Sequence, residues 1–316
     1  MTEKTLPTLS IILPTYDEHE RLIDAIKSLG QQEYPKDLVE ILVIDDGSPE
    51  PIDQTSLIKL AIPFKLLLFR NNNNQGRAHS RNTGLRNASG EIIIFLDSDM
   101  TVLPTFFSSH VQMHRGKSDS IGVGNIIWAD EIPDNPLTRY ASSRGVHLTN
   151  ISDEVPFKCF VTGNSSVPKA LLDRTGPFDE DFKTYGGEDL ELGARLHSKG
   201  ARFFYIPEAL SYHHHSRPLK EFCQLMYDYG LKSLPIVLEK HPVLKGLLRL
   251  DFLDRSNLTI NRILFRIVLL RPVYLTIFFL TRLGMYWYVP DLFFDYLIWY
   301  NRTRGYLKSL TFKTKK

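Results

Sequence analysis

Acidic side chains stand at three places in the N-terminal third of the sequence, each where a short apolar run ends. The first place is residues 15–18, the second is Asp45 and Asp46, and the third is Asp97 and Asp99. A single aspartate after an apolar run is usually a turn former or a helix cap. Three clusters are harder to explain in this way, because neighbouring carboxylates repel one another unless a cation neutralises them. Hard oxygen ligands suit Mg²⁺ or Mn²⁺, which proteins commonly share with substrate phosphates, so the pattern predicts a metal–diphosphate site.

The apolar runs that precede these clusters alternate with segments of helical spacing. The expected strands cover residues 9–13, 39–44, 64–69, 91–96 and 202–206, and residues 160–166 are expected as a strand that enters a turn. The expected helices cover residues 17–29, 77–87 and 189–199. Continuous apolar strands alternating with helices are typical of a parallel sheet that is covered on both faces. Ligands bind at the carboxyl ends of the strands in such sheets. The fold class is therefore α/β, with the three acidic clusters at one edge of the sheet.

A fourth acidic group follows a double glycine. Gly186 and Gly187 precede Glu188 and Asp189, which begin a helical pattern that stops at Gly200. Acids are favoured at a helix N-terminus as caps and by the helix dipole, so a structural role explains the pair without chemistry. The glycines favour a functional role, because they allow the backbone to approach a ligand closely and give the loop mobility.

Four motifs together carry a family resemblance. They are Leu13–Tyr16, Val43–Ser48, Gly76–Gly84 and Phe95–Asp99. In order and spacing the chain resembles the family 2 glycosyltransferases of the GT-A fold, over residues 8 to about 225. The resemblance implies a Rossmann-like, mostly parallel sheet covered by helices, and inverting transfer of a sugar from a nucleotide-diphosphate sugar, expected to be a UDP-sugar, to a hydroxyl group. Asp17 departs from the pattern, since many relatives carry asparagine there.

The resemblance also implies a donor site. The residues that would hold the nucleotide are Pro14, Thr15, Tyr16, Glu18, Asp46, Gly76, Arg77, Arg81, Asp97 and Ser98. By the resemblance Arg77 and Arg81 would face the diphosphate. Their chemistry agrees, since a guanidinium forks onto phosphate oxygens and their i,i+4 spacing puts them on one side of a helix; a solvated helix face is the plain alternative. Asp99 would bind Mn²⁺ or Mg²⁺, with His213 preferred to His214 and His215 as a second ligand.

The acceptor side follows from residues 186–189, which are similar to an element of family 2 enzymes resembling bacterial chondroitin polymerase. By that likeness Asp189 is the general base, Glu188 orients the acceptor, and a carboxylate with an ordinary pKa takes the hydroxyl proton. The residues that would lie against the donor sugar and the acceptor are Thr162, Gly163, Asn164 and Gly187. The acceptor would be a glycan, a lipid-linked glycan or another hydroxyl compound.

Two other functions stay open. Residues 97–101 also fit the DxDxT motif of haloacid-dehalogenase-like phosphatases, although three expected strands precede it here and that motif is expected near the start of the domain. A non-catalytic module that binds nucleotide sugars is the other alternative.

The last hundred residues differ from the rest in charge and in aromatic content. Residues 1–215 hold 21 Lys and Arg against 29 Asp and Glu, a balance of −8, whereas residues 216–316 hold 17 against 7, a balance of +10, and 18 of the 36 aromatic residues. We therefore expect a catalytic domain over residues 1–215 and a basic, aromatic-rich helical region over 216–316, with helices near 219–239 and 251–270 and breaks at Pro272 and Pro290. In the second of these helices Arg255, Arg262 and Arg266 share one face.

A basic face combined with Trp, Phe and Leu is typical of interfacial helices. We expect the C-terminal region to lie on the inner surface of the cell membrane, with packing of its aromatic residues on the catalytic domain or in a homodimer interface as the alternative. Nucleic acid is not expected as a partner, because the acidic part would repel phosphates. Cys159 and Cys223 form no CxxC pair and no apolar stretch is long enough to span a bilayer, which favours a cytoplasmic, peripherally attached protein.

Overall fold

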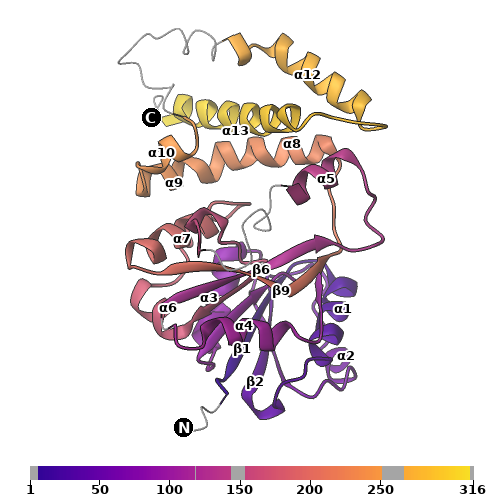
Figure 1. Ribbon diagram of the computed structural model, residues 1–316, viewed down its shortest axis with the longest axis vertical. Helices are drawn as coiled ribbons and strands as arrows, with labels where there is room; N and C mark the ends of the chain where they lie inside the picture. Colours follow the sequence, from indigo (N-terminus) through magenta and orange to yellow (C-terminus); the bar gives the residue numbers. More distant parts are fainter. Residues whose placement is uncertain (1–5, 118, 144–153, 251–266, 314–316) are drawn as a thin grey trace. The chain divides into compact units, whose positions relative to one another are not determined.

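A computed structural model describes residues 6–117, 119–143, 154–250 and 267–313. These residues form two compact units (Figure 1). The first unit comprises Met1–Ile132, Ser143–Lys183 and Glu188–His215, and the second comprises Pro133–Ser142, Thr184–Gly187 and Ser216–Lys316. The main division falls where the charge balance changes, but two short segments from the N-terminal part group with the C-terminal helices.

The first unit is built on one mixed sheet. Its strands are β1 (Leu9–Thr15), β2 (Val39–Asp45), β3 (Lys65–Arg70), β4 (Ile92–Leu96), β5 (Met100–Val102), β6 (Ser120–Trp128), β7 (Glu154–Val155), β8 (Asn164–Pro168) and β9 (Arg202–His213). They lie in the order β3-β2-β1-β4-β8-β6-β9-β5, and β7 pairs with β9. Strands β1 to β4 are parallel, as predicted, and β8 then pairs antiparallel with both β4 and β6.

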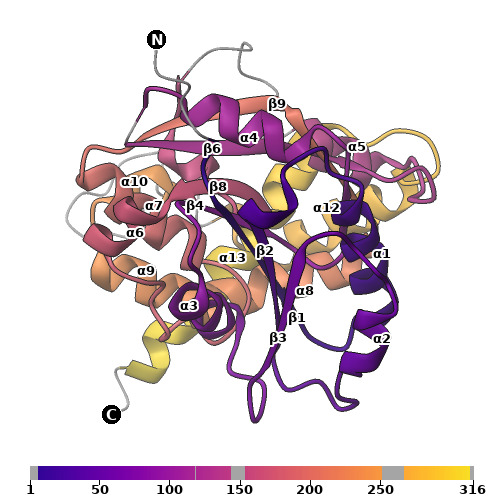
Figure 2. The same cartoon turned by 90° about the horizontal axis from the view of Figure 1, so that it is seen from below.

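Helices cover both faces of this sheet (Figures 1 and 2). They are α1 (His19–Gly30), α2 (Gln54–Ile58), α3 (Arg77–Asn87), α4 (Phe106–His114), α6 (Lys169–Thr175) and α7 (Glu188–Ser198), with short 3-10 turns η1 (Lys36–Leu38) and η3 (Phe157–Cys159). The α/β class with covered parallel strands is therefore confirmed. Helix α3 has the bounds predicted for it.

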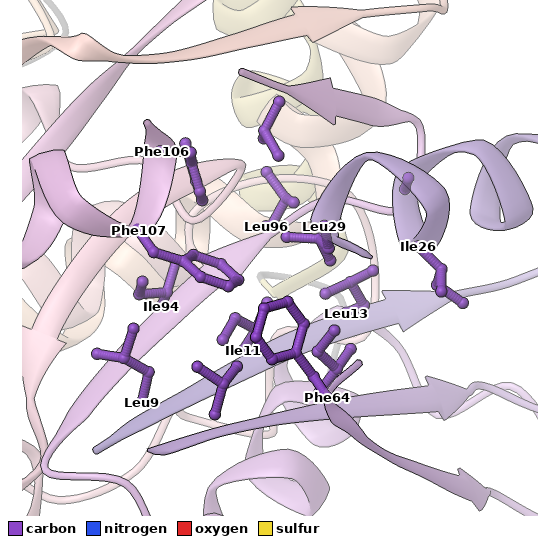
Figure 3. Close-up of a cluster of buried hydrophobic side chains, with 14 of the residues drawn as sticks. Leu9, Ile11, Leu13, Ile26, Leu29, Phe64, Ile94, Leu96, Phe106 and Phe107 are labelled. Atoms are coloured by element: carbon purple, nitrogen blue, oxygen red, sulfur yellow. The ribbon is translucent and has the colours of Figure 1, made fainter. Parts of the chain in front are cut away.

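The two faces of β1 show why these residues form this sheet. Alternate side chains of a strand point to opposite faces, so Leu9 and Ile11 enter one cluster with Phe106 and Phe107 (Figure 3). Ile12 points to the other face, where a Cβ placed on Gly84 of α3 would lie only 2.6 Å from its Cγ2 atom. Both faces are buried and apolar, which explains the unbroken apolar run. The carboxyl ends of β1, β2 and β4 are thereby fixed beside one another.

Two sequence expectations about strands need correction. Residues 160–166 are expected as a strand that enters a turn, but the order is reversed: Thr162 and Gly163 form a turn, and the strand β8 begins after it at Asn164. The strand expected over 202–206 continues as β9 to His213. Its pairing with β6 shifts between Gly124 and Asn125, so that Ile206 pairs with Gly124 and Leu210 with Asn125. Pro207 lies in this irregularity, where a residue without an N–H is tolerated.

The second unit is helical. Its helices are α5 (Pro136–Ser143), α8 (Leu219–Asp228), α9 (Leu234–Lys240), α10 (Leu244–Leu247), α12 (Arg271–Gly284) and α13 (Asp291–Lys313), and the π-turn η4 (Tyr229–Ser233) joins α8 to α9. Apolar side chains of α5, α8 and α13 share one cluster, which includes Tyr140, Leu219 and Phe294. Pro272 and Pro290 stand at helix starts, since α12 has proline in its first turn and α13 follows Pro290 directly. The basic helix expected over 251–270 lies almost entirely outside the described residues.

Glycine sets a close helix crossing at the π-turn. A Cβ placed on Gly230 would lie 2.0 Å from the carbonyl oxygen of Arg302 in α13, and one on Gly305 would lie 2.1 Å from that of Tyr227. Only glycine permits this approach. The same turn contacts the segment Thr184–Gly187, because the Ser233 hydroxyl donates to the Tyr185 carbonyl over 3.1 Å.

Candidate active site

The carboxyl end of β2 anchors the loop that leads into α3. Oδ1 of Asp46 accepts hydrogen bonds from the Gln75 N–H (3.0 Å) and from Nδ2 of Asn71 (2.8 Å). Its Oδ2 accepts from the Gly76 N–H (2.9 Å). Gly76 has φ +93°, a conformation that L side chains rarely adopt. Asp46, expected to hold the nucleotide, therefore fixes the glycine turn before α3.

The turn after β1 lies next to this loop, because the Asp46 N–H donates to the Thr15 carbonyl over 2.8 Å. Tyr16 is 44% exposed, while Pro14 and Glu18 are half-buried. Asp17 adopts a left-handed φ of 56°. Asparagine and aspartate tolerate this conformation better than most residues, so the departure from the family pattern is compatible with the same turn.

Arg77 and Arg81 have different surroundings although they lie one turn apart on α3. Arg77 is exposed, whereas Arg81 is 1% exposed. Nη2 of Arg81 donates to Oδ1 of Asp97 and Nη1 donates to Oε1 of Glu188, both over 3.1 Å. Nη1 also lies 3.8 Å from Oδ1 of Asp189. The structure thus joins the end of β4 to the start of α7 through one buried guanidinium, whose charge three carboxylates surround.

Asp189 is held by Thr162 from the opposite side. The Thr162 hydroxyl donates to Oδ1 over 2.7 Å and the Thr162 N–H donates to Oδ2 over 3.2 Å. Burial and the neighbouring Glu188 raise the pKa of Asp189 to about 6, against the lowering effects of Arg81 and Thr162. The pKa is therefore above the ordinary value expected from the sequence. A carboxylate with this pKa is a stronger base and is still mostly ionised at neutral pH.

The raised pKa gives a testable pH dependence. The family resemblance assigns Asp189 as a general base, which must be ionised to accept a proton, so on that assignment we expect the rate of sugar transfer to fall as the pH drops through about 6. Thr162→Val removes a hydrogen bond to the ionised form and should move this fall upward by about one pH unit. The measurement is the pH profile of nucleoside diphosphate release, with Thr162→Ser as the variant that keeps the hydroxyl. Coinciding profiles for the valine and serine variants would contradict the assignment.

Asp99 and His213 form the second part of the site. Nε2 of His213 lies 3.1 Å from Oδ2 of Asp99, and the Trp128 ring stacks on the imidazole at 5.1 Å between centroids. Burial raises the pKa of Asp99, but the hydrogen bond from His213 and the charges of His213, Arg77 and His215 outweigh it, so the pKa lies below its ordinary value. Oδ1 of Asp99 is buried and has no hydrogen-bond partner among the described residues.

This arrangement fits a divalent cation, since Asp99 keeps one unpartnered oxygen, Oδ1, while its other oxygen, Oδ2, faces the imidazole nitrogen of His213. Within the described ranges no group of three or more His, Cys, Asp or Glu is arranged to hold a metal ion. Two protein ligands are nevertheless enough where substrate phosphates and water complete the shell. His214 is engaged elsewhere, because its ring nitrogens contact the Thr101 hydroxyl and Glu131.

Of the other residues predicted for the site, Gly163, Ser98 and Gly187 lie near the residues described above, whereas Asn164 lies inside the sheet. Gly163 lies against the end of β4, because the Asp97 N–H donates to its carbonyl over 3.2 Å. Ser98, between the two aspartates, is buried. Gly187, in the second unit, has φ +100°, which explains the glycine there.

Asn164 is fully buried, and its Nδ2 donates to the Ala209 carbonyl (2.8 Å) and to the Ser211 hydroxyl (3.0 Å). Its Oδ1 contacts Nε2 of His110 over 3.1 Å. The expectation that its side chain contacts a sugar is therefore revised, because these bonds hold it inside the sheet.

Sequence reasoning missed two aromatic neighbours of the site. Trp128 stacks on His213 only because β6 and β9 pair in the register that sets these two residues side by side. Phe178 lies under Arg81, with the guanidinium carbon 5.7 Å from the ring centroid. Neither residue stands in a motif, so no local signal identifies it.

The parallel strands, the acidic clusters at their ends and the antiparallel continuation define the GT-A architecture. The comparisons with known proteins agree. Residues 10–175, more than half of the chain, match the family described as glycosyl transferase family 2, and residues 144–217 match the N-terminal domain of galactosyltransferase. The chain therefore belongs to glycosyl transferase family 2, which confirms the predicted family and enzyme class and leaves the phosphatase alternative without support.

Individual proteins of similar sequence are also named as glycosyltransferases or polysaccharide synthases. The chain is 29% identical to the uncharacterized glycosyltransferase YfnE of Bacillus subtilis over 253 residues, 65% of this chain and 64% of that protein. It is 30% identical to the chondroitin synthase of Pasteurella multocida over 241 residues, 65% of this chain and 24% of that protein. The chain thus spans less than two thirds of the length of either relative.

A solved structure shares the fold. The mannosyltransferase PcManGT of Pyrobaculum calidifontis, determined in complex with GDP-Man and Mn²⁺, superposes with a TM-score of 0.65 at 17% identity, covering 96% of this chain and 87% of that one. At this identity the likeness concerns the fold alone.

Proposed function

We propose that this protein is an inverting glycosyltransferase that moves a sugar from a nucleotide-diphosphate sugar to an acceptor hydroxyl and depends on a divalent cation. One observation carries the proposal: Arg81 binds Asp97, at the end of β4, together with Glu188 at the start of α7 and lies close to Asp189. The donor-side aspartate and the candidate base thus belong to one cluster around the buried Arg81. PcManGT, which shares the fold, was determined in complex with a nucleotide sugar and Mn²⁺. This supports the proposal that the present chain binds a nucleotide sugar together with a divalent cation.

In the proposed reaction Asp189 accepts the proton of the acceptor hydroxyl. The hydroxyl oxygen forms a bond to the anomeric carbon while the bond from that carbon to the diphosphate breaks, and the electron pair leaves with the nucleoside diphosphate. One displacement inverts the configuration. Thr162 holds both oxygens of Asp189, and Glu188 orients the acceptor.

The donor lies along the carboxyl ends of the parallel strands in this proposal. Residues 14–16 and 18 border the base and ribose, a UDP-sugar being the expected donor, and the exposed Arg77 faces the phosphates. Asp99 and His213 would hold Mn²⁺ or Mg²⁺, which when bound neutralises charge on the departing diphosphate. The acceptor would be a glycan, a lipid-linked glycan or another hydroxyl compound.

The direct test is thermal stability in the presence of UDP, GDP and their sugar conjugates, with Mn²⁺, Mg²⁺ or EDTA. A ligand that binds only the folded state at 100 times its Kd stabilises it by about 2.7 kcal/mol. Cation-dependent stabilisation by one nucleotide series supports the donor site, and release of that nucleoside diphosphate on adding acceptors supports transfer. Donor binding without turnover over a broad acceptor panel would favour the non-catalytic module, and no stabilisation at all would refute the proposal.

The cation site has its own prediction. Asp99→Asn and His213→Ala should each weaken Mn²⁺-dependent donor binding by about 10–100-fold. Each substitution removes one proposed ligand of the cation and also the hydrogen-bond partner of the other ligand. His214→Ala is the matched control, since the ring of His214 contacts Thr101 and Glu131 instead. Titration of Mn²⁺ at fixed nucleotide measures the effect. Equal losses in the two histidine variants would argue against His213 as the ligand.

We further propose that the second unit attaches the protein peripherally to a membrane. No helix in the described ranges is both long enough and apolar enough to cross a bilayer. The +10 balance of residues 216–316 supports attraction to anionic lipids.

A further inference from the structure

Helix α12 carries apolar side chains on two sides. Tyr274, Ile277 and Phe278 pack against the buried cluster that includes Phe294 and Leu297 of α13. Leu275, Phe279 and Leu283, spaced by four residues, form a second apolar row and are 51%, 65% and 48% exposed. A helix in a globular protein normally presents charged or polar residues on the side away from the core. The exposed row therefore calls for an apolar or interfacial partner.

The chain after α12 extends this row. Tyr286, Trp287 and Tyr288 are 79%, 74% and 74% exposed. Tyr and Trp combine an apolar ring with a polar group, and they are enriched where proteins meet the boundary between lipid and water. We call the six residues of this row and turn, Leu275, Phe279, Leu283, Tyr286, Trp287 and Tyr288, the α12 patch.

Charge decides between the possible partners. Arg271 and Arg282 at the two ends of α12 are exposed, and residues 216–316 carry a balance of +10. A second copy of this unit would bring the same positive charge to the contact and be repelled. An anionic lipid surface would be attracted, by about 1 kcal/mol for each basic residue near it.

We propose that the α12 patch inserts into the interfacial layer of an anionic bilayer, with α12 lying in the plane of the surface. The helix has 14 residues, too few to cross a hydrocarbon core that needs about 20. Its inner side remains packed on α13 while the outer row enters the headgroup region. The inference rests on the membrane attachment proposed above and names the surface that makes it.

The test is co-sedimentation of the full chain with phosphatidylcholine vesicles, with and without phosphatidylglycerol. We expect binding to the vesicles that contain phosphatidylglycerol. Phe279→Ser and Trp287→Ser should each weaken it by about tenfold, the effect of withdrawing one large apolar side chain from lipid. Ile58→Ser and Val243→Ser are matched controls, because Ile58 and Val243 are 69% and 84% exposed outside the patch. Binding that does not depend on phosphatidylglycerol, or equal losses in all four variants, would overturn the proposal.

Size-exclusion chromatography with light scattering completes the test. A dimer that Phe279→Ser and Trp287→Ser dissociate would show that a second copy covers the patch, and it would overturn the lipid assignment. Donor binding by the same variants, measured by thermal shift, should equal that of the unaltered chain. Failure of the donor site and failure of the α12 patch are therefore observed in separate assays.

Discussion

Replacing Asp189 by Asn is expected to lower the rate of sugar transfer by about 10²–10⁴-fold, the usual contribution of a general base. The asparagine side chain has nearly the same shape, so its contact with the Thr162 hydroxyl can persist. The amide cannot, however, accept the proton of the acceptor hydroxyl. The Asp99 and His213 pair is unchanged, so donor affinity should remain within a factor of about two. The two quantities are measured by single-turnover transfer and by donor titration.

Asp173→Asn is the control for this substitution, because Asp173 is an exposed aspartate of α6 that pairs with Lys169. It should leave both quantities unchanged. Transfer by the Asp189→Asn variant at the unaltered rate would remove Asp189 as the base. Loss of donor binding together with transfer would instead assign Asp189 to the donor site.

Replacing Arg81 by Met is expected to destabilise the folded state by about 3–5 kcal/mol, the typical effect of removing one partner from a buried ion pair. Arg81 is 1% exposed, and its guanidinium contacts Asp97 and Glu188. Methionine keeps much of the apolar volume but leaves these carboxylates without their shared cation. Denaturant unfolding measures the loss. Arg86→Met on the same helix is the control, since Arg86 is 56% exposed, and should cost less than about 1 kcal/mol.

The pH dependence separates the charge of Arg81 from its packing. The pKa of Asp189 is already raised to about 6 although the charge of Arg81 lowers it, so without the guanidinium it lies further above its unfolded value. The folded variant then binds protons more tightly than the unfolded chain, so its stability rises as the pH falls. The destabilisation should be smaller at pH 5 than at pH 8. A loss that does not change with pH would show that packing, not charge, accounts for it.

The sequence was sufficient for the parts of the fold that depend on short-range patterns. Apolar runs predicted β1 to β4, and the stretch Arg77–Asn87 between two of these runs was predicted as the helix α3, because these patterns lie within single elements. Strand and turn over residues 160–166 were predicted in the wrong order, since the apolar Phe160 and Val161 indicate a strand while the turn at Thr162 and Gly163 has no periodic signal. The motifs named most residues at the strand ends, but they did not show how the residues interact.

Interactions between distant residues could not be predicted. Glu188 lies 107 positions after Arg81 in the sequence, so its contact with the guanidinium depends on the packing of α3 and α7. A phosphate-binding arginine and a buried one look alike in a motif. The role of Asn164 was ambiguous in the same way. A polar residue in a turn-like stretch can face a ligand or, as here, form hydrogen bonds to a neighbouring strand.

The contact between the π-turn η4 and the segment Thr184–Gly187 bears on how this chain can be divided. The Ser233 hydroxyl donates to the Tyr185 carbonyl, and a Cβ on Gly186 would lie 3.1 Å from the Tyr229 ring. A chain cut at residue 215 would keep the double glycine and lose both partners. The C-terminal helices are thus not an interchangeable module: a homologous tail grafted at that boundary must supply its own hydroxyl and aromatic ring, or the four residues before Glu188 lose their support.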